Sequence, residues 1–160
     1  MKKIFIVLAA GIIALSFAGC GNGQATTQEA VDTLADSWED VDSLEVAEEL
    51  AGFEVELPLE VASEYDELTY RYCSALNEIE VEYSEGNLRK AKDNGDISGD
   101  YEEYKEVLEV TENGLTATLK GSGDGVFNLA IWRNGDFAYS ISQPYGATAA
   151  EMKSLIGGFK

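Results

Sequence analysis

The chain has 160 residues, with 30 acidic side chains, 11 basic side chains and no histidine, and its formal net charge is -19. The length favours a single domain, and the absence of histidine excludes Ser-His-Asp, Cys-His and HExxH chemistry. The strong negative charge argues against nucleic acid as a partner, because phosphate backbones are bound by lysine and arginine.

The N-terminal residues have the pattern of a secretory signal. Two lysines precede an apolar run, residues 4–17, which is followed by Ala18-Gly19-Cys20. As a helix this run would be about 21 Å long, too short for the ~30 Å hydrocarbon core of a bilayer. The pattern therefore predicts that residues 1–19 are a signal peptide and that the apolar run is not a membrane anchor.

The triplet Ala18-Gly19-Cys20 resembles the lipobox of bacterial lipoproteins, in which the cysteine is acylated and becomes the first mature residue. The resemblance implies lipid attachment at Cys20 and a place on the outer, extracytoplasmic face of the cell membrane. A diacylglyceryl group carries two acyl chains, which is enough for stable anchoring. The alternative is an ordinary signal peptide that is cleaved nearby and leaves Cys20 free.

Residues 20–42 are expected to form an acidic tether, because acidic side chains occur after Cys20 without any lysine or arginine. Apolar residues at three- and four-residue spacing also fit a short amphipathic helix between Thr27 and Trp38. Residues 43–160 are expected to fold as a single α+β domain.

The first element of this domain is a helix from Ser43 to Ala51, with Asp42 or Ser43 as its cap and Gly52 at its end. After the helix, apolar and polar residues alternate, which predicts half-buried strands. Four such strands are expected in the first half of the domain, over residues 53–57, 68–73, 78–83 and 88–92.

The last two of these strands bring glutamates beside basic residues, and cross-strand ion pairs of this kind favour one register. Lys90 breaks the alternation of the second strand, because by parity with Leu88 its side chain points inward. Either a β-bulge shifts the register there or this lysine has a specific role.

Two later hairpins are marked by Asn-Gly turns, the strongest short hairpin signal. They join residues 107–111 to 115–120 and residues 127–131 to 137–141. Thr148 then caps a closing helix that ends at Gly157-Gly158. This order predicts the α+β class, with a curved, largely antiparallel sheet of about eight strands, an open half-barrel, and one helix before and one after the strands.

Five blocks of the domain are Arg89–Ala91, Asp96–Tyr101, Thr118–Gly121, Ala130–Trp132 and Tyr139–Ser142. They resemble a family of small secreted or lipid-anchored domains of unknown function from anaerobic Firmicutes. The resemblance runs from about Asp42 to Ile156, and the Asp96–Tyr101 block is its most specific part. It implies a lipoprotein of the cell envelope, and because the family has no assigned activity it transfers no catalytic residue.

Seven residues are candidates for binding: Arg89, Lys90, Lys92, Asp96, Asp100, Tyr101 and Trp132. The basic ones could bind a carboxylate or phosphate group, or instead neutralise the strand glutamates. The acidic loop after residue 92 carries oxygen ligands that calcium prefers, but its spacing fails the EF-hand pattern, and its carboxylates could instead fold the loop onto itself. Aromatic residues at strand spacing fit either a core or a binding face. No metal and no cofactor are expected.

Two functions remain open. The first is a non-catalytic, surface-tethered domain that binds a protein, peptide or envelope component through an exposed patch. The second is a carrier or sensor of a hydrophobic small ligand such as a lipid, in an apolar cavity between sheet and helices lined by Leu129, Ile131 and Tyr139. The small size and the lack of histidine or a nucleophile motif argue against an enzyme, and the N-terminal lipid would make the membrane a partner.

Overall fold

The computed structural model describes residues 37–92 and 95–160. The expected signal peptide, the lipid attachment site at Cys20 and residues 20–36 of the expected tether lie outside these residues. Eight strands form one open antiparallel sheet in the order β1-β2-β3-β4-β8-β7-β6-β5. Their bounds are β1 Trp38–Val41, β2 Thr69–Cys73, β3 Glu78–Tyr83, β4 Gly86–Ala91, β5 Glu106–Glu112, β6 Leu115–Gly123, β7 Val126–Asn134 and β8 Phe137–Thr148.

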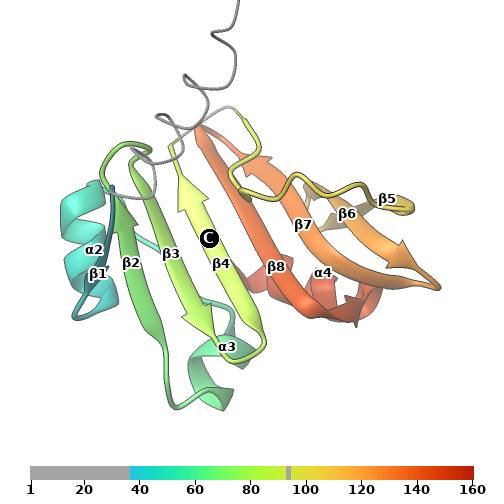
Figure 1. Ribbon diagram of the computed structural model, residues 1–160, viewed down its shortest axis with the longest axis horizontal. Helices are drawn as coiled ribbons and strands as arrows, with labels where there is room; N and C mark the ends of the chain where they lie inside the picture. Colours follow the sequence, from blue (N-terminus) through green and yellow to red (C-terminus); the bar gives the residue numbers. More distant parts are fainter. Residues whose placement is uncertain (1–36, 93–94) are drawn as a thin grey trace, which may run out of the picture.

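Three helices accompany the sheet: α2 Leu44–Ala51, α3 Leu59–Glu64 and α4 Ala149–Gly158. In Figure 1 all three lie behind the sheet, on what we call the helix face. The segment from β4 to β5 crosses the front of the sheet, which we call the loop face. The α+β class and the antiparallel sheet are confirmed, but two helices rather than one precede β2. Within the described residues, no helix is both long and apolar enough to cross a membrane.

Two expected boundaries in the first part of the chain are wrong. Residues 38–41, expected to belong to the tether, form the edge strand β1 and pair with β2, whereas residues 53–57 form no strand of the sheet. The alternation of residues 53–57 is real, since Val55 is buried, but this segment packs on the helix face. There the amide of Glu56 donates to the carbonyl of Lys160 at 2.7 Å, and the amide of Lys160 donates back at 3.0 Å.

The local signals at turns and helix ends are confirmed. Asn113 and Gly114 both have positive φ, 50° and 82°, and they turn the chain from β5 into β6. Thr148 forms a capping box with Glu151 at the start of α4, so two backbone donors of the helix end are satisfied. The closing strand β8 is longer than expected, with 12 residues, and lies between β4 and β7 in the middle of the sheet.

The core lies between the helix face and the three helices. Trp132 and Tyr139 stack on neighbouring strands with ring centroids 5.1 Å apart, and Phe159, just after α4, meets both rings edge-on. All three are nearly fully buried, which favours their reading as core residues. Trp132 therefore contributes chiefly to packing.

Candidate functional site

A buried charge cluster lies on the loop face, where β2, β3 and β4 are neighbours. Glu80 is fully buried, and its carboxylate accepts from Arg71 Nη1 at 3.0 Å and from Arg89 Nε at 2.5 Å. Arg89 Nε also lies 3.6 Å from the buried Glu78. The ring of Trp38 lies 5.1 and 5.3 Å from the two guanidinium groups. Of the two alternatives for the basic candidates, neutralisation of the strand glutamates therefore holds for Arg89, and Arg71 on β2 takes part in it.

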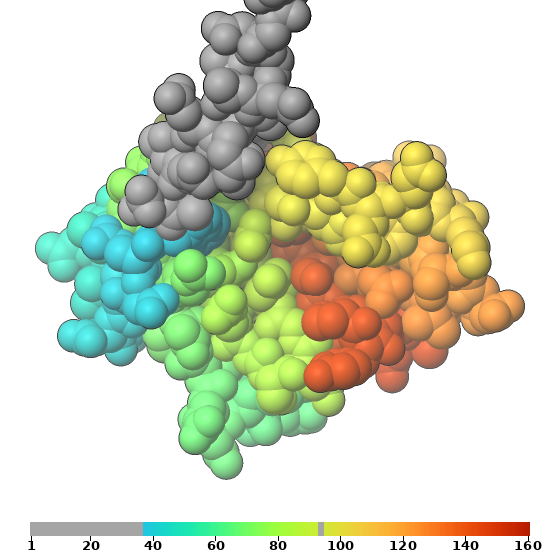
Figure 2. Space-filling model, viewed as in Figure 1, coloured from blue at the N-terminus to red at the C-terminus, as the bar shows by residue number. Residues whose placement is uncertain are grey.

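Arg89 also holds the loop that crosses this face. Its Nη1 donates to the carbonyl oxygens of Ile97 and Ser98 at 3.3 and 3.0 Å. Asp96 folds the same loop onto itself, because its Oδ1 accepts from the amide and hydroxyl of Ser98 at 3.0 and 2.6 Å. Its Oδ2 accepts from Lys120 Nζ at 3.2 Å, which ties the loop to β6. Figure 2 shows this segment in yellow over the upper part of the loop face.

Asp100 has the same kind of local role. Its Oδ1 accepts from the amide of Glu102 at 2.8 Å, and its Oδ2 accepts from the hydroxyl of Tyr104. These bonds are the turn pattern typical of aspartate in loops. In the part of the chain that the structure describes, no group of three or more metal-ligating side chains is placed to hold an ion.

Lys90 points toward the helix face, and the β3–β4 pairing shows no register shift around it. Its Nζ donates to the carbonyl of Glu54 at 2.6 Å and lies 4.7 to 5.6 Å from three ring centroids, those of Phe53, Phe137 and Tyr139. Burial lowers the pKa of Lys90, against the attraction of nearby carboxylates. The alternatives were a β-bulge or a specific role for this lysine. The specific role holds, because Lys90 ties residues 53–57 to the sheet.

The seven candidate residues do not form one site. Three of them line a cavity of about 260 Å³ beneath the loop: Arg89, Asp96 and Tyr101. Lys90 and Trp132 are buried in the core. Asp100 lines a separate depression near Pro144, and Lys92 is exposed just after β4.

Among the described residues, Leu129, Ile131 and Tyr139 do not line the apolar cavity that was expected between sheet and helices. Ile131 is paired with Ser140, and Trp132 is paired with Tyr139, so Ile131 and Tyr139 point to opposite faces of the sheet. Leu129 shares the loop face with Ile131 and is fully buried. These three side chains therefore cannot line one cavity.

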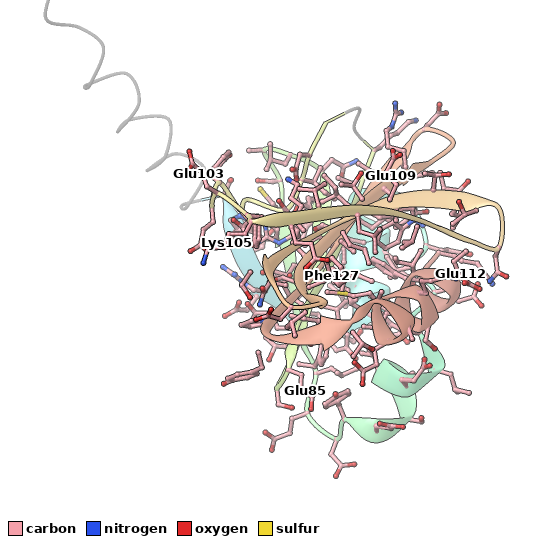
Figure 3. The ribbon with its side chains drawn as sticks, turned by 90° about the vertical axis from the view of Figure 1, so that its right-hand side faces the viewer. Glu85, Glu103, Lys105, Glu109, Glu112 and Phe127 are labelled. Carbon is pink, nitrogen blue, oxygen red and sulfur yellow. The ribbon has the colours of Figure 1, made fainter. Side chains whose placement is uncertain are left out.

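A cavity of about 490 Å³ does lie between the helices and the sheet, but it is built from other residues. We call it the α3–α4 pocket, because it lies between those two helices and the ends of β3 and β8. Its walls combine apolar, aromatic and polar side chains, including Val61, Leu155, Tyr65, Tyr83 and Gln143. In Figure 3, Glu85, which also lines it, lies beside α3, and Glu103 lies on the other side of the sheet.

The aromatic wall of the pocket is fixed by packing and by one buried hydrogen bond. The rings of Tyr65 and Tyr83 lie 4.8 Å apart at 54°. Gln143 is 6% exposed, and its Nε2 donates to the hydroxyl of Tyr83 at 2.6 Å. This bond fixes the amide, so Gln143 presents a polar group in the pocket wall.

Carboxylates surround the pocket: Glu60, Glu64, Glu85 and Glu151. A hydrogen bond from the hydroxyl of Ser154 lowers the pKa of Glu60. Bonds from the backbone and side chain of Thr148 lower the pKa of Glu151. Both effects favour the ionised form, so the rim is negatively charged near neutral pH.

We expect the free energy of unfolding to fall as the pH rises from about 10 toward 12. Burial, followed by a hydrogen bond to Glu85, raises the pKa of Tyr65 from 10.0 to about 12. The folded chain keeps this proton in a range where the unfolded chain loses it, so stability is present below pH 10 and is lost as the pH rises through the folded pKa. Urea unfolding at about pH 9 and about pH 11 measures the decline.

For the variant Tyr65→Phe, the free energy of unfolding should fall less between these two pH values than it does for the native chain, because the variant lacks the titrating hydroxyl. The matched control is Tyr145→Phe, at a tyrosine that is 83% exposed, and its decline should equal that of the native chain. Equal declines for Tyr65→Phe and the native chain would contradict the raised pKa.

The sequence did not reveal this pocket, because its walls come from four separate segments. Tyr65 and two glutamates belong to α3 and its end, and Tyr83 and Glu85 to the end of β3 and the turn after it. Gln143 belongs to β8, and Glu151 belongs to α4. The one available local signal was Pro58 followed by a short run of helix-forming residues, since proline is tolerated at helix starts. In comparisons with known proteins, no family model, no curated protein and no solved structure matches this chain.

Proposed function

We propose that the chain is a non-catalytic binding domain that is held on the outer face of the cell membrane by a lipid on Cys20 and takes its ligand in the α3–α4 pocket. The observation that carries the proposal is the pocket itself, about 490 Å³ in volume, with the buried Gln143 in its wall. Ligand sites are typically concave, partly apolar and provided with a few fixed polar groups.

The signal pattern at the N-terminus and the acidic charge of the chain support the anchored location. An acidic domain is repelled by anionic headgroups, so the lipid would provide the attachment while the domain stands off the bilayer. Cys20→Ala is expected to release the protein from membranes of its host. A variant that stays with the membrane fraction would contradict lipid anchoring.

The non-catalytic role is supported by the loop carboxylates, because Asp96 and Asp100 accept hydrogen bonds within their own loop. The walls of the pocket favour a ligand with a polar group over a purely hydrophobic lipid. An acyl chain there would lie against Gln143 and a rim of carboxylates, whose desolvation is costly. The ligand is thus expected to be a polar envelope component or the polar end of one.

Binding in the pocket is tested by NMR with the full chain in a nonionic detergent and a fragment set of cationic, neutral and anionic compounds. Some members should shift the side-chain amide signal of Gln143. Ala150→Trp should suppress these shifts, because Ala150 is exposed on α4 and lines the pocket. Ala62→Trp places the same ring at an exposed position of α3 that does not line it, and should leave binding unchanged. If no compound shifts the pocket signals, the proposed function is wrong.

A further inference from the structure

Among the residues that the structure describes, the lining of the α3–α4 pocket carries negative charge and no positive charge. Its described lining residues include four glutamates and neither lysine nor arginine. Lys153 of α4 points elsewhere, since its Nζ lies 3.2 Å from Glu112. A ligand with a positive charge would therefore gain attraction from the whole rim.

The partners of these glutamates within the described residues are neutral groups. Glu60 accepts from the hydroxyl of Ser154, and Glu151 accepts from the amide and hydroxyl of Thr148 at 2.7 and 2.8 Å. Glu85 lies close enough to the hydroxyl of Tyr65 to help raise the pKa of that group. Such bonds fix the carboxylates in place and leave their charge to act on a ligand.

The inner wall carries an acceptor and two aromatic rings. The Nε2 atom of Gln143 donates to Tyr83, and no described residue donates to its Oε1. This oxygen belongs to a side chain that is 94% buried, since the exposed fraction is 6%, and that lines the pocket. The neighbouring rings of Tyr65 and Tyr83 offer apolar surface beside this acceptor, against which the body of a ligand can pack.

We propose that the α3–α4 pocket binds an organic ammonium group, with the positive nitrogen between Gln143 Oε1 and the glutamate rim and its apolar body against Tyr65 and Tyr83. This inference rests on the proposed function, since it names the ligand class of the same pocket. An acceptor, aromatic rings and carboxylates together fit a cationic hydrogen-bond donor and exclude an anion. Val61 and Leu155 extend the apolar surface that the body of the ligand would contact.

The test compares three probes of nearly equal shape, cyclohexylmethylammonium, cyclohexylmethanol and cyclohexanecarboxylate, with the full chain in nonionic detergent. The shift of the Gln143 side-chain amide gives the affinity. We expect the ammonium ion to bind about tenfold more tightly than the alcohol, and the carboxylate to bind more weakly than both.

Variants separate the charge of the rim from the shape of the pocket. Glu64→Gln/Glu85→Gln removes two exposed rim charges and should weaken ammonium binding about fivefold while leaving the alcohol unchanged. Glu102→Gln/Glu103→Gln makes the same charge change on exposed residues of the loop, away from the pocket, and should leave both affinities unchanged. Gln143→Leu lacks the reporting amide, so its affinities are read from the backbone amide of Ala147, which also lines the pocket. This variant should bind the ammonium ion more weakly, with a smaller loss for the alcohol.

The outcomes distinguish this inference from the proposed function. Equal affinities of ammonium ion and alcohol in the pocket would overturn the inference and leave the pocket as a binding site. If other fragments bind in the pocket and the ammonium probe does not, the inference is likewise overturned and the pocket remains a binding site. If no compound of any charge shifts the Gln143 amide, the proposed function is wrong and the inference is wrong with it.

Discussion

Replacing Arg89 by methionine is expected to lower the free energy of unfolding by about 3–5 kcal/mol, because breaking a buried ion pair leaves an uncompensated charge in the interior. Arg89 Nε lies 2.5 Å from Glu80 and 3.6 Å from Glu78, and both carboxylates are buried. In the variant, Arg71 would face this pair of carboxylates as the nearest guanidinium, 3.0 Å from Glu80. Urea unfolding near neutral pH measures the loss.

The control is Lys105→Met, which removes a positive charge from an exposed residue of the loop and should change stability by less than about 0.5 kcal/mol. The double variant Arg89→Met/Glu80→Gln should recover part of the loss, because it removes one of the buried charges. A loss below about 1 kcal/mol for Arg89→Met would mean that water reaches the carboxylates, which contradicts a buried cluster.

The same variant has a local readout that a general loss of stability would not give. Arg89 donates to the carbonyls of Ile97 and Ser98, so its removal should loosen the loop over residues 95–105. Amide hydrogen exchange under native conditions should therefore accelerate in this loop more than in β7. Equal acceleration in both segments would indicate global destabilisation and would argue against Arg89 as the anchor of the loop.

The hairpins could be predicted from the sequence because their signals are local. Asn113-Gly114 requires a turn whatever lies around it, and the alternation of β3 needs only its own residues. The choice between Trp38–Val41 and residues 53–57 as a strand could not be made locally. The second segment alternates more clearly, but the first pairs with β2, whereas the second pairs with the backbone of Lys160.

For the candidate functional residues, too, the sequence predicts local features and not contacts between distant segments. Lys90 was correctly expected to point inward, but its contacts with Phe53 and Phe137 depend on segments that meet only in the folded chain. The loop from Asp96 to Asp100 had the strongest local pattern of polar groups, and those groups bind one another. The α3–α4 pocket had no local pattern, because its walls come from four segments. Local spacing therefore finds turns and periodicity, and it does not find a site assembled by the fold.

The second large effect is expected at the end of the chain, where Phe159→Ala should lower the free energy of unfolding by about 3–5 kcal/mol. Phe159 is 1% exposed, and its ring centroid lies 5.9 Å from Trp132 and 5.4 Å from Tyr139. The alanine variant loses the transfer free energy of the ring and leaves a cavity beside two rings that face each other across β7 and β8. Urea unfolding measures the loss.

Two further variants decide whether the loss comes from the ring. Phe159→Leu fills part of the cavity and should lose clearly less than Phe159→Ala. Lys160→Ala changes the next residue, whose ion pair with Glu56 is exposed, and should lose about 0–1 kcal/mol, because the backbone bonds between these two residues remain. If Lys160→Ala were as destabilising as Phe159→Ala, the side-chain ion pair between Lys160 and Glu56 would contribute as much as the ring of Phe159, which contradicts this assignment. We expect Phe159→Ala to be the least stable of the three variants, Phe159→Leu to be clearly more stable, and Lys160→Ala to be the most stable. This order would assign the stability of this end of the chain to the aromatic contacts of the core.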